Sequence, residues 1–146
     1  MKKAPILVDS MALATEAHKG QFDKSGVAYI LHPLRIMHRM HTETEKIVGV
    51  LHDIVEDTPI TLEELKEKGY SQEIIDALDH LTKREGENYG DFIKRCRNNP
   101  IALKVKIADL EDNMDIRRMD MVLDRDLERL NRYLVAWRYL TCVPES

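Results

Sequence analysis

One imidazole and three carboxylates stand close together in residues 50–59 (VLHDIVEDTP). On a helical wheel, His52, Asp53, Glu56 and Asp57 fall within an arc of roughly 140°. The aliphatic side chains of the segment fill the opposite side, and the segment contains no lysine or arginine. Imidazole and carboxylate groups gathered in this way can bind a divalent cation or move protons.

The end of this predicted helix adds a second signal. Pro59 disfavours helical geometry at Thr58, so we expect the helix to end near Asp57. Glu56 and Asp57 then lie in the last turn, where the helix dipole disfavours each anion by about 0.3–1 kcal/mol. This arrangement indicates a site that receives a cation from elsewhere. The alternative is a polar helix end that faces water.

Two further positions could contribute to such a site. His32 precedes Pro33, and we expect it at the N-cap of a helix or just before it, held out of helical geometry and free to reach a neighbour. Asp109 lies between Ala108 and Leu110 in a segment expected to be buried, where a carboxylate needs a cation or several donors. The alternatives are a capping or surface histidine and an exposed acid at a helix end.

Composition excludes several classes of protein. The chain has 146 residues, enough for one domain with a proper core, and its net charge of −4 argues against a protein that coats nucleic acid. No run approaches the length of a membrane span. Cys96 and Cys142 form no metal or redox motif and are expected to stay reduced in the cytoplasm.

Helix signals run along the whole chain, and they predict an all-α fold, a single-domain bundle of about seven to eight helices over residues 1–146. The last helix, about 121–140, carries an apolar stripe that we expect to close the bundle; a dimer seam is the alternative. The expected helices span about 5–19, from 33, about 44–57, about 62–68, from 72, about 89–97, from 100 and about 121–140.

Together the candidates make a set of two imidazoles and two carboxylates: His32, His52, Asp53 and Asp109. Nitrogen and oxygen ligands without thiolate suit Mn²⁺, Fe²⁺, Zn²⁺ or Mg²⁺ rather than a structural zinc knot. Such an ion makes bound water more acidic. Glu56 and Asp57 would then be free to orient that water or take its proton.

Three blocks carry a resemblance to a known family. The order His…His-Asp…Asp is similar to the HD superfamily of metal-dependent phosphohydrolases, and the blocks AHKGQFDKSGVAYILHPLRI, LHDIVEDTPITLEEL and KVKIADLEDNMD resemble the hydrolase domain of the RelA/SpoT group and its small stand-alone alarmone hydrolases. The resemblance implies removal of the 3′-pyrophosphate of guanosine tetra- or pentaphosphate with Mn²⁺. It also implies roles for individual residues: His32, His52, Asp53 and Asp109 as ligands, Glu56 and Asp57 handling water, and Lys24, Ser25 and Asn113 binding substrate.

Departures from the family pattern fall in the parts that read the base. Asp23 stands where the family usually has the arginine that stacks on guanine, Ile116 where it often has threonine, and Asp112 where its Asp-Arg-Leu-His-Asn motif has histidine. A hydrolase of another nucleotide or phosphate ester, and a non-catalytic nucleotide sensor, therefore stay open. In each case we expect a small-molecule nucleotide as partner, with no nucleic acid and no membrane, and a monomer or homodimer.

Overall fold

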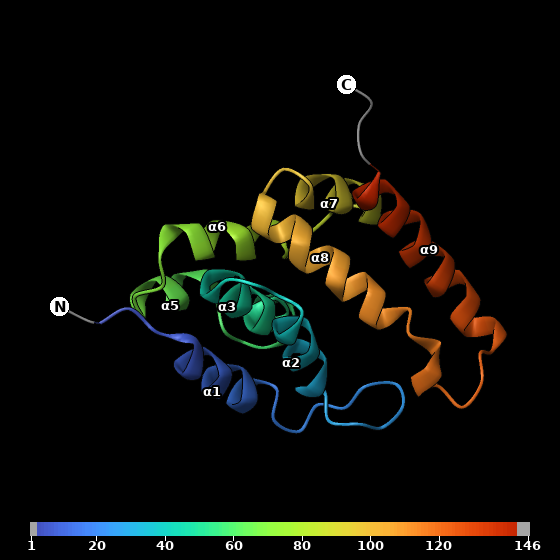
Figure 1. The fold of residues 1–146 in the computed structure, drawn as a ribbon, viewed down its shortest axis with the longest axis horizontal. Coiled ribbons are helices and arrows are strands. Elements are labelled where there is room, and N and C mark those ends of the chain that lie inside the picture. The colour runs from blue at the N-terminus through green and yellow to red at the C-terminus, as the bar shows by residue number, and fades with distance from the viewer. Residues whose placement is uncertain (1–2, 143–146) are drawn as a thin grey trace.

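The computed structural model describes residues 3–142 and confirms the all-α fold. Within these residues the chain forms nine α-helices and one short 3-10 helix, with a single isolated bridge between Phe22 and Ala28 (Figure 1). The elements are α1 (Leu7–Ala17), α2 (Leu31–His38), α3 (Glu43–Leu51), α4 (Ile54–Asp57), α5 (Leu62–Glu67), α6 (Gln72–His80), α7 (Tyr89–Cys96), α8 (Pro100–Asn113), η1 (Ile116–Arg118) and α9 (Asp124–Thr141).

Helix α3 lies at the centre of the bundle and contacts α1, α2, α6 and α8 (Figure 1). Its start is set by a capping box, in which Thr42 Oγ1 accepts from the Glu45 amide and Glu45 Oε1 accepts from the Thr42 amide. A Cβ at Gly49 would lie 3.4 Å from the backbone of Met37, so glycine allows α2 to approach closely. The buried wall of this helix fixes the position of its last turn, where His52 follows.

The helix predicted over about 44–57 is interrupted, which accounts for the ninth helix. α3 ends at Leu51, His52 and Asp53 form a turn, and α4 begins at Ile54. His52 Nδ1 lies 2.7 Å from the Gly49 carbonyl, the group that an uninterrupted helix would pair with the Asp53 amide. The imidazole competes for this acceptor, and the resulting turn brings His52 and Asp53 to the same side of the molecule.

The expectation that His32 stands outside its helix is wrong. His32 is the second residue of α2, and Ile30 occupies the N-cap. Pro33 still falls in the first turn, where its missing amide hydrogen costs no intrahelical bond. A turn ahead of the helix, in which the His32 amide donates to the Tyr29 carbonyl at 3.0 Å, outweighs the weak preference of a residue before proline for extended backbone.

Helix α8 lies between the α2–α3 pair and α9 (Figure 1). α9 packs on α8 through its C-terminal half, where Ala136 and Leu140 are buried. In the N-terminal half of α9, the apolar stripe that the sequence predicts is not buried, because Leu123 and Leu127 are 38% and 49% exposed. That half extends past the core and forms one wall of a cleft.

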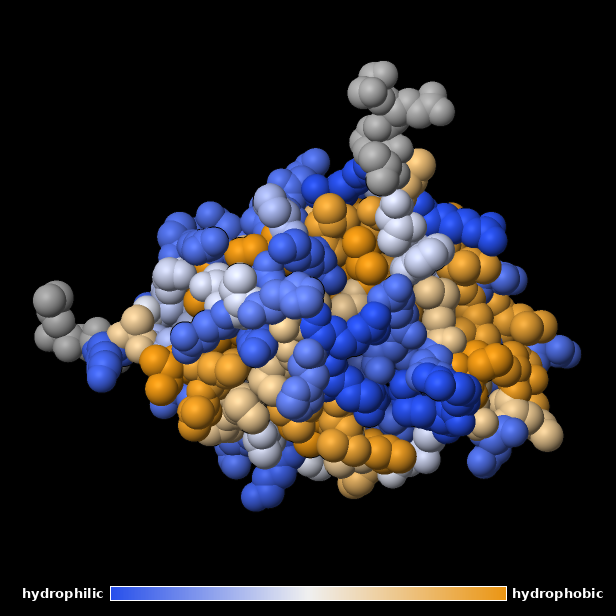
Figure 2. Space-filling model, in the orientation of Figure 1, coloured by the Kyte–Doolittle hydropathy of each residue, from blue (hydrophilic) through white to orange (hydrophobic). Residues whose placement is uncertain are grey.

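Apolar side chains gather along the flanks of the face in Figure 2, and hydrophilic ones cover its middle. Among the described residues, no helix combines the length and apolar character needed to cross a membrane.

Candidate metal centre and substrate cleft

The structure brings together the four residues predicted as metal ligands. His32 lies on α2, His52 and Asp53 in the turn after α3, and Asp109 in the last part of α8. One donor atom from each lies within 4.8 Å of the other three. His32 Nε2 is 2.8 Å from Asp109 Oδ1, and His52 Nε2 is 3.0 Å from Asp53 Oδ2. Segments 77 positions apart in the sequence thus meet at one point.

The spacing of these donors fits a divalent ion. Ligands at about 2.1 Å from an ion lie about 3 Å apart when they are neighbours in an octahedron. Two further donor pairs lie near this distance, with His52 Nε2 at 3.3 Å from Asp109 Oδ1 and His32 Nε2 at 3.6 Å from Asp53 Oδ2. The chemistry and geometry of the donor set therefore fit a divalent metal ion.

Both histidines have their second nitrogen engaged. His52 Nδ1 donates to the Gly49 carbonyl at 2.7 Å, and His32 Nδ1 lies 2.5 Å from Asp112 Oδ2. A carbonyl and a carboxylate can only accept, so each Nδ1 carries a hydrogen, and each Nε2 is the nitrogen that would bind a cation through its lone pair. Nothing in the sequence indicated that Asp112, three residues after Asp109, orients His32.

Electrostatics in the centre follow from burial and close pairing. Burial of Asp53 opposes its ionisation, but the neighbouring His52 outweighs it and lowers the pKa of Asp53 to about 2. Lys106 and the two histidines likewise hold the pKa of Asp109 well below its usual range. The pKa of His52 is raised well above its ordinary value, because Asp53 and Asp109 outweigh the effect of burial. The carboxylates are therefore negative at neutral pH, as metal ligands must be.

Tyr29 is a contributor that sequence reasoning missed. Its hydroxyl donates to Asp53 Oδ2, and its ring packs against the His32 ring with centroids 5.7 Å apart. Burial and the nearby Asp53 raise its pKa well above the ordinary value, so the hydroxyl keeps its hydrogen. In the sequence, the indication for this role was the tyrosine at the end of the segment Lys24–Tyr29.

Glu56 and Asp57 occupy different positions around the centre. Glu56 lines the inner cavity beside Asp53 and Asp109, and its Oε1 accepts from the Lys83 amide at 2.6 Å. Asp57 is not among the residues that line this cavity. Burial, together with repulsion by Asp53 and Glu56, raises the pKa of Asp57 to about 6. Glu56 is therefore the better placed of the two to meet a water molecule above the centre.

The inner cavity holds about 240 Å³ and contains both acidic and basic groups. The carboxylates of Asp53, Asp109 and Glu56 face the side chains of Lys83, Lys106 and Arg132. Positive groups opposite a divalent ion are the arrangement that binds a phosphate group from two sides.

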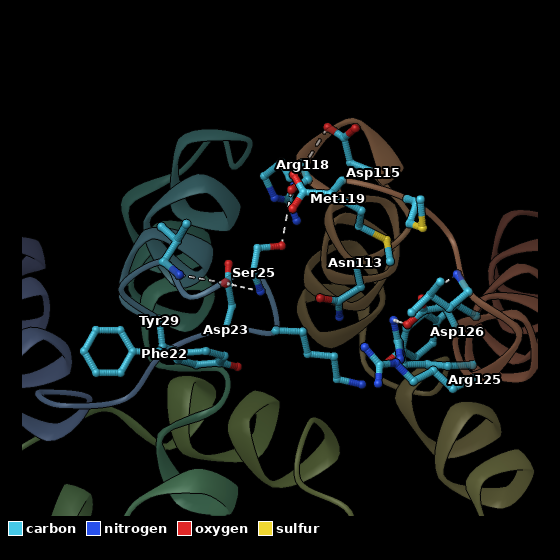
Figure 3. A pocket seen from close by; sticks show the side chains of 17 residues that line it. Phe22, Asp23, Ser25, Tyr29, Asn113, Asp115, Arg118, Met119, Arg125 and Asp126 are labelled. Carbon is cyan, nitrogen blue, oxygen red and sulfur yellow. Dashed lines mark hydrogen bonds and ion pairs between the residues drawn. The ribbon is translucent and has the colours of Figure 1, made fainter.

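A larger outer cleft of about 1130 Å³ continues from this cavity, and Tyr29, Asn113 and Tyr133 line both. The cleft lies between the loop of residues 21–29 and the segment from the end of α8 to α9, with Asn113 on its floor (Figure 3). Its basic residues are Lys24, Arg118, Arg125 and Arg129. Burial and the nearby Arg129 lower the pKa of Lys24. Four aspartates, Asp23, Asp115, Asp120 and Asp126, also line the cleft, so it offers basic groups without a net positive charge.

The three residues predicted to bind substrate all lie in this cleft. Lys24 lines the cleft. Ser25 Oγ donates to the Arg118 carbonyl at 3.2 Å and so joins the two walls (Figure 3). Asn113 Nδ2 donates to Asp109 Oδ1 at 3.2 Å and links the cleft floor to the metal centre. Ser25 and Asn113 therefore support the shape of the site as well as lining it.

Asp23 has a local role that its sequence position did not indicate. Its Oδ1 accepts from the amides of Ser25 and Val27 at 2.8 and 2.9 Å (Figure 3). This carboxylate closes the loop that carries Lys24.

The two consecutive arginines after α8 differ in position. Arg118 lines the cleft, but Arg117, paired with Asp115, does not.

Comparison with known proteins agrees with this geometry. No family model matches the chain. A guanosine-3′,5′-bis(diphosphate) 3′-pyrophosphohydrolase of Haemophilus influenzae is 37% identical over 116 residues, covering 70% of this chain and 17% of that protein. A GTP pyrophosphokinase of Myxococcus xanthus is 29% identical over 143 residues, covering 86% and 18%. The chain belongs to the RelA/SpoT-type HD hydrolase domains.

A solved structure shares the fold of this RelA/SpoT-type domain. It is described as a metazoan ortholog of SpoT that hydrolyzes ppGpp, and it matches with a TM-score of 0.74 at 18% identity, covering 96% of this chain and 85% of that one. The chain spans less than a fifth of the length of the two relatives above, which carry the names of a hydrolase and of a kinase.

Proposed function

We propose that this RelA/SpoT-type domain is a metal-dependent phosphohydrolase that removes the 3′-pyrophosphate of guanosine 3′-diphosphate 5′-diphosphate, giving guanosine 5′-diphosphate and pyrophosphate. The observation that carries the proposal is the convergence of His32, His52, Asp53 and Asp109 beside a cavity that contains basic side chains and opens into a larger cleft. A pure binding module would not need a carboxylate such as Glu56 in the same cavity.

In this proposal the four convergent residues are the ligands, and the ion is Mn²⁺. Two imidazoles and two carboxylates suit Mn²⁺, and on a six-coordinate ion they leave two positions open. When bound, the ion supplies Lewis acidity, which polarises a phosphoryl oxygen and lowers the pKa of water.

The other residues bind, orient and move protons. Glu56 accepts a proton from the water that attacks the phosphorus bonded to the ribose 3′-oxygen, with Asp57 next to it. A bond forms between the water oxygen and phosphorus, the bond from phosphorus to the ribose 3′-oxygen breaks, and the 3′-oxygen takes up a proton from solvent while Glu56 returns its own to solvent. Lys83, Lys106 and Arg132 offset the charge of the departing pyrophosphate, while Tyr29 fixes the carboxylate of Asp53.

The outer cleft holds the rest of the nucleotide. Its volume exceeds the roughly 300–1,000 Å³ usual for small-molecule sites, and Lys24, Arg118, Arg125 and Arg129 are available to a second phosphate group. We place the reaction in the cytoplasm, with the protein acting as a monomer or homodimer and binding no nucleic acid, in keeping with its net charge of −4.

The test is a nucleotide panel assayed with purified protein, Mn²⁺ and a stripped control. We expect the guanosine bis-diphosphate to give guanosine diphosphate and pyrophosphate in equal amounts, and D53A to give none. Absence of reaction with every nucleotide, in protein that binds Mn²⁺, would contradict the proposal.

A second substrate is favoured by one observation. The residue before Lys24 is Asp23, whose carboxylate is used by its own loop, so no arginine is available there to stack on guanine. A hydrolase of the same group that accepts another base would release pyrophosphate from adenosine or pyrimidine analogues of the substrate at equal rates. The same panel separates the two.

A further inference from the structure

Asp112 lies directly behind the metal centre, on α8, with its side chain 7% exposed. Its Oδ2 is 2.5 Å from His32 Nδ1. On the other side Arg35 donates from Nε to Oδ1 at 2.8 Å and from Nη2 to Oδ2 at 3.0 Å, and Arg118 Nη1 lies 3.3 Å from Oδ1. One carboxylate thus joins a metal-centre histidine to two arginines.

This contact decides which nitrogen of His32 faces the site. A neutral imidazole carries one hydrogen, and a hydrogen on Nε2 would block metal binding at that atom. Nε2 points towards Asp53 and Asp109, so with a cation bound there the one hydrogen must lie on Nδ1, where the carboxylate of Asp112 accepts it.

The two arginines compensate the negative charge of the buried Asp112 carboxylate. A buried carboxylate without compensating donors is costly, and its direction would not be fixed. Arg35 binds both oxygens of Asp112 in the bidentate geometry that holds a carboxylate plane in place. The imidazole is therefore aligned by a rigid acceptor.

His52 and His32 differ in the kind of group that accepts the hydrogen bond from Nδ1. His52 Nδ1 donates to the backbone carbonyl of Gly49, which is present whatever the side chain. His32 depends on a side chain instead, and that side chain comes from the helix that also carries Asp109.

We propose that Asp112 is a positioning residue of the metal centre, whose carboxylate holds His32 in the ring orientation and hydrogen placement that let Nε2 bind a divalent cation. The inference rests on the proposed function, because it takes the metal centre as given. A purely structural Asp112 would join α2 to α8 through its ion pairs and would affect unfolding alone.

The experiment measures metal affinity in the full chain. Chelator-treated wild type, D112N and E111Q are titrated with Mn²⁺ and free Mn²⁺ is followed by electron paramagnetic resonance. D112N keeps the shape of the side chain and removes its charge, and we expect its affinity to fall roughly 10- to 100-fold. E111Q is the matched control, since Glu111 lies next in sequence but contacts Arg39 and Trp137, and it should bind as wild type does.

A second readout observes His32 itself. In Zn²⁺-loaded, ¹⁵N-histidine-labelled protein, we expect the His32 signals to show hydrogen on Nδ1 in the wild type, and an altered or exchange-broadened Nδ1 signal in D112N. The signals of His52 should stay unchanged, because its acceptor is a backbone carbonyl.

The outcomes separate this inference from the proposed function. A wild type that binds no Mn²⁺ contradicts the metal centre itself. A wild type that binds, together with a D112N that binds equally well and has only a lower free energy of unfolding, overturns the positioning role. If D112N lacks helical circular dichroism, D112S is titrated in its place, and loss of the fold in both variants assigns Asp112 a structural role and overturns the proposal.

Discussion

Lys106 Nζ lies 2.8 Å from Oδ2 of Asp109, while Oδ1 of the same carboxylate faces the Nε2 atoms of the two metal-centre histidines. The side chains of Lys106 and Asp109 are only 12% and 5% exposed. Burial would lower the pKa of Lys106, but Asp109 outweighs this and raises it above the ordinary value. The lysine therefore balances part of the negative charge gathered for a cation.

The first prediction concerns a variant in which Asp109 loses the positive charge of Lys106. Lys106→Met keeps the packing of the stem and leaves Asp109 without its cation, which should lower the free energy of unfolding by about 3 kcal/mol in the presence of chelator. Urea unfolding measures the change. Mn²⁺ should reduce the difference in unfolding free energy between Lys106→Met and wild type, because it binds the carboxylate that Lys106 had compensated. Lys66→Met, in an exposed pair with Glu63, is the control and should stay within about 0.5 kcal/mol of wild type; equal effects of the two substitutions would contradict the argument.

The second prediction separates the two acids of the water-handling pair. Glu56→Gln should keep full metal content and lower turnover by roughly 10²-fold, the scale of a lost general base. Asp57→Asn should have a smaller effect, since Asp57 does not line the inner cavity. Turnover and elemental analysis of both variants provide the measurement. A larger loss in Asp57→Asn would move the role to that residue.

The third prediction concerns the pH dependence of stability. Glu45 accepts from Lys104 Nζ at 2.7 Å and from the His41 amide at 3.1 Å, and these donors hold its pKa below the usual value. A depressed folded-state pKa contributes stability that is present above the unfolded pKa of about 4.3 and is lost as pH falls through the folded-state pKa. Glu45→Gln should therefore unfold more easily than wild type at pH 7 by about 1 kcal/mol, the scale of a lost cap.

Urea titrations from pH 7 down to acid conditions test this window. The difference between Glu45→Gln and wild type should shrink below about pH 4.3. A difference that stays constant with pH would show that Glu45 acts through packing and not through its charge.

Much of this architecture followed from the sequence because it depends on local signals. Thr61 and Ser71 cap helices that begin at Leu62 and Gln72, where the sequence predicted helix starts, whereas the cap at Thr42 begins α3 slightly before the predicted start near 44. The all-α fold and the existence of each predicted helix are confirmed. The convergence of His32 with Asp109 was expected because a buried carboxylate at Asp109 needs a cation, because His32 could reach a neighbour, and because the motif blocks resemble a family.

The remaining features depend on tertiary contacts that no local pattern encodes. The break at His52 arises from a hydrogen bond between an imidazole and the Gly49 carbonyl, and the exposure of Leu127 from how far α9 extends beyond α8. The hydrogen bond of Tyr29 to Asp53 joins residues 24 positions apart. The periodicity of a sequence indicates which face of a helix is apolar, but not which other element packs against that face.

The last prediction concerns the substrate loop, where the structure changes what the sequence implied about Asp23. In the sequence, Asp23 was a departure from the arginine usual in the family, whereas the structure shows an acceptor for the amides of Ser25 and Val27. Asp23→Asn keeps an acceptor oxygen and removes the charge, and Asp23→Ala removes both. If loop closure is what matters, Asp23→Ala should raise KM for the nucleotide severalfold with little change in kcat, because Lys24 is held less firmly, while Asp23→Asn should behave as wild type. A lower KM in both variants would instead identify Asp23 as a repulsive charge at the cleft.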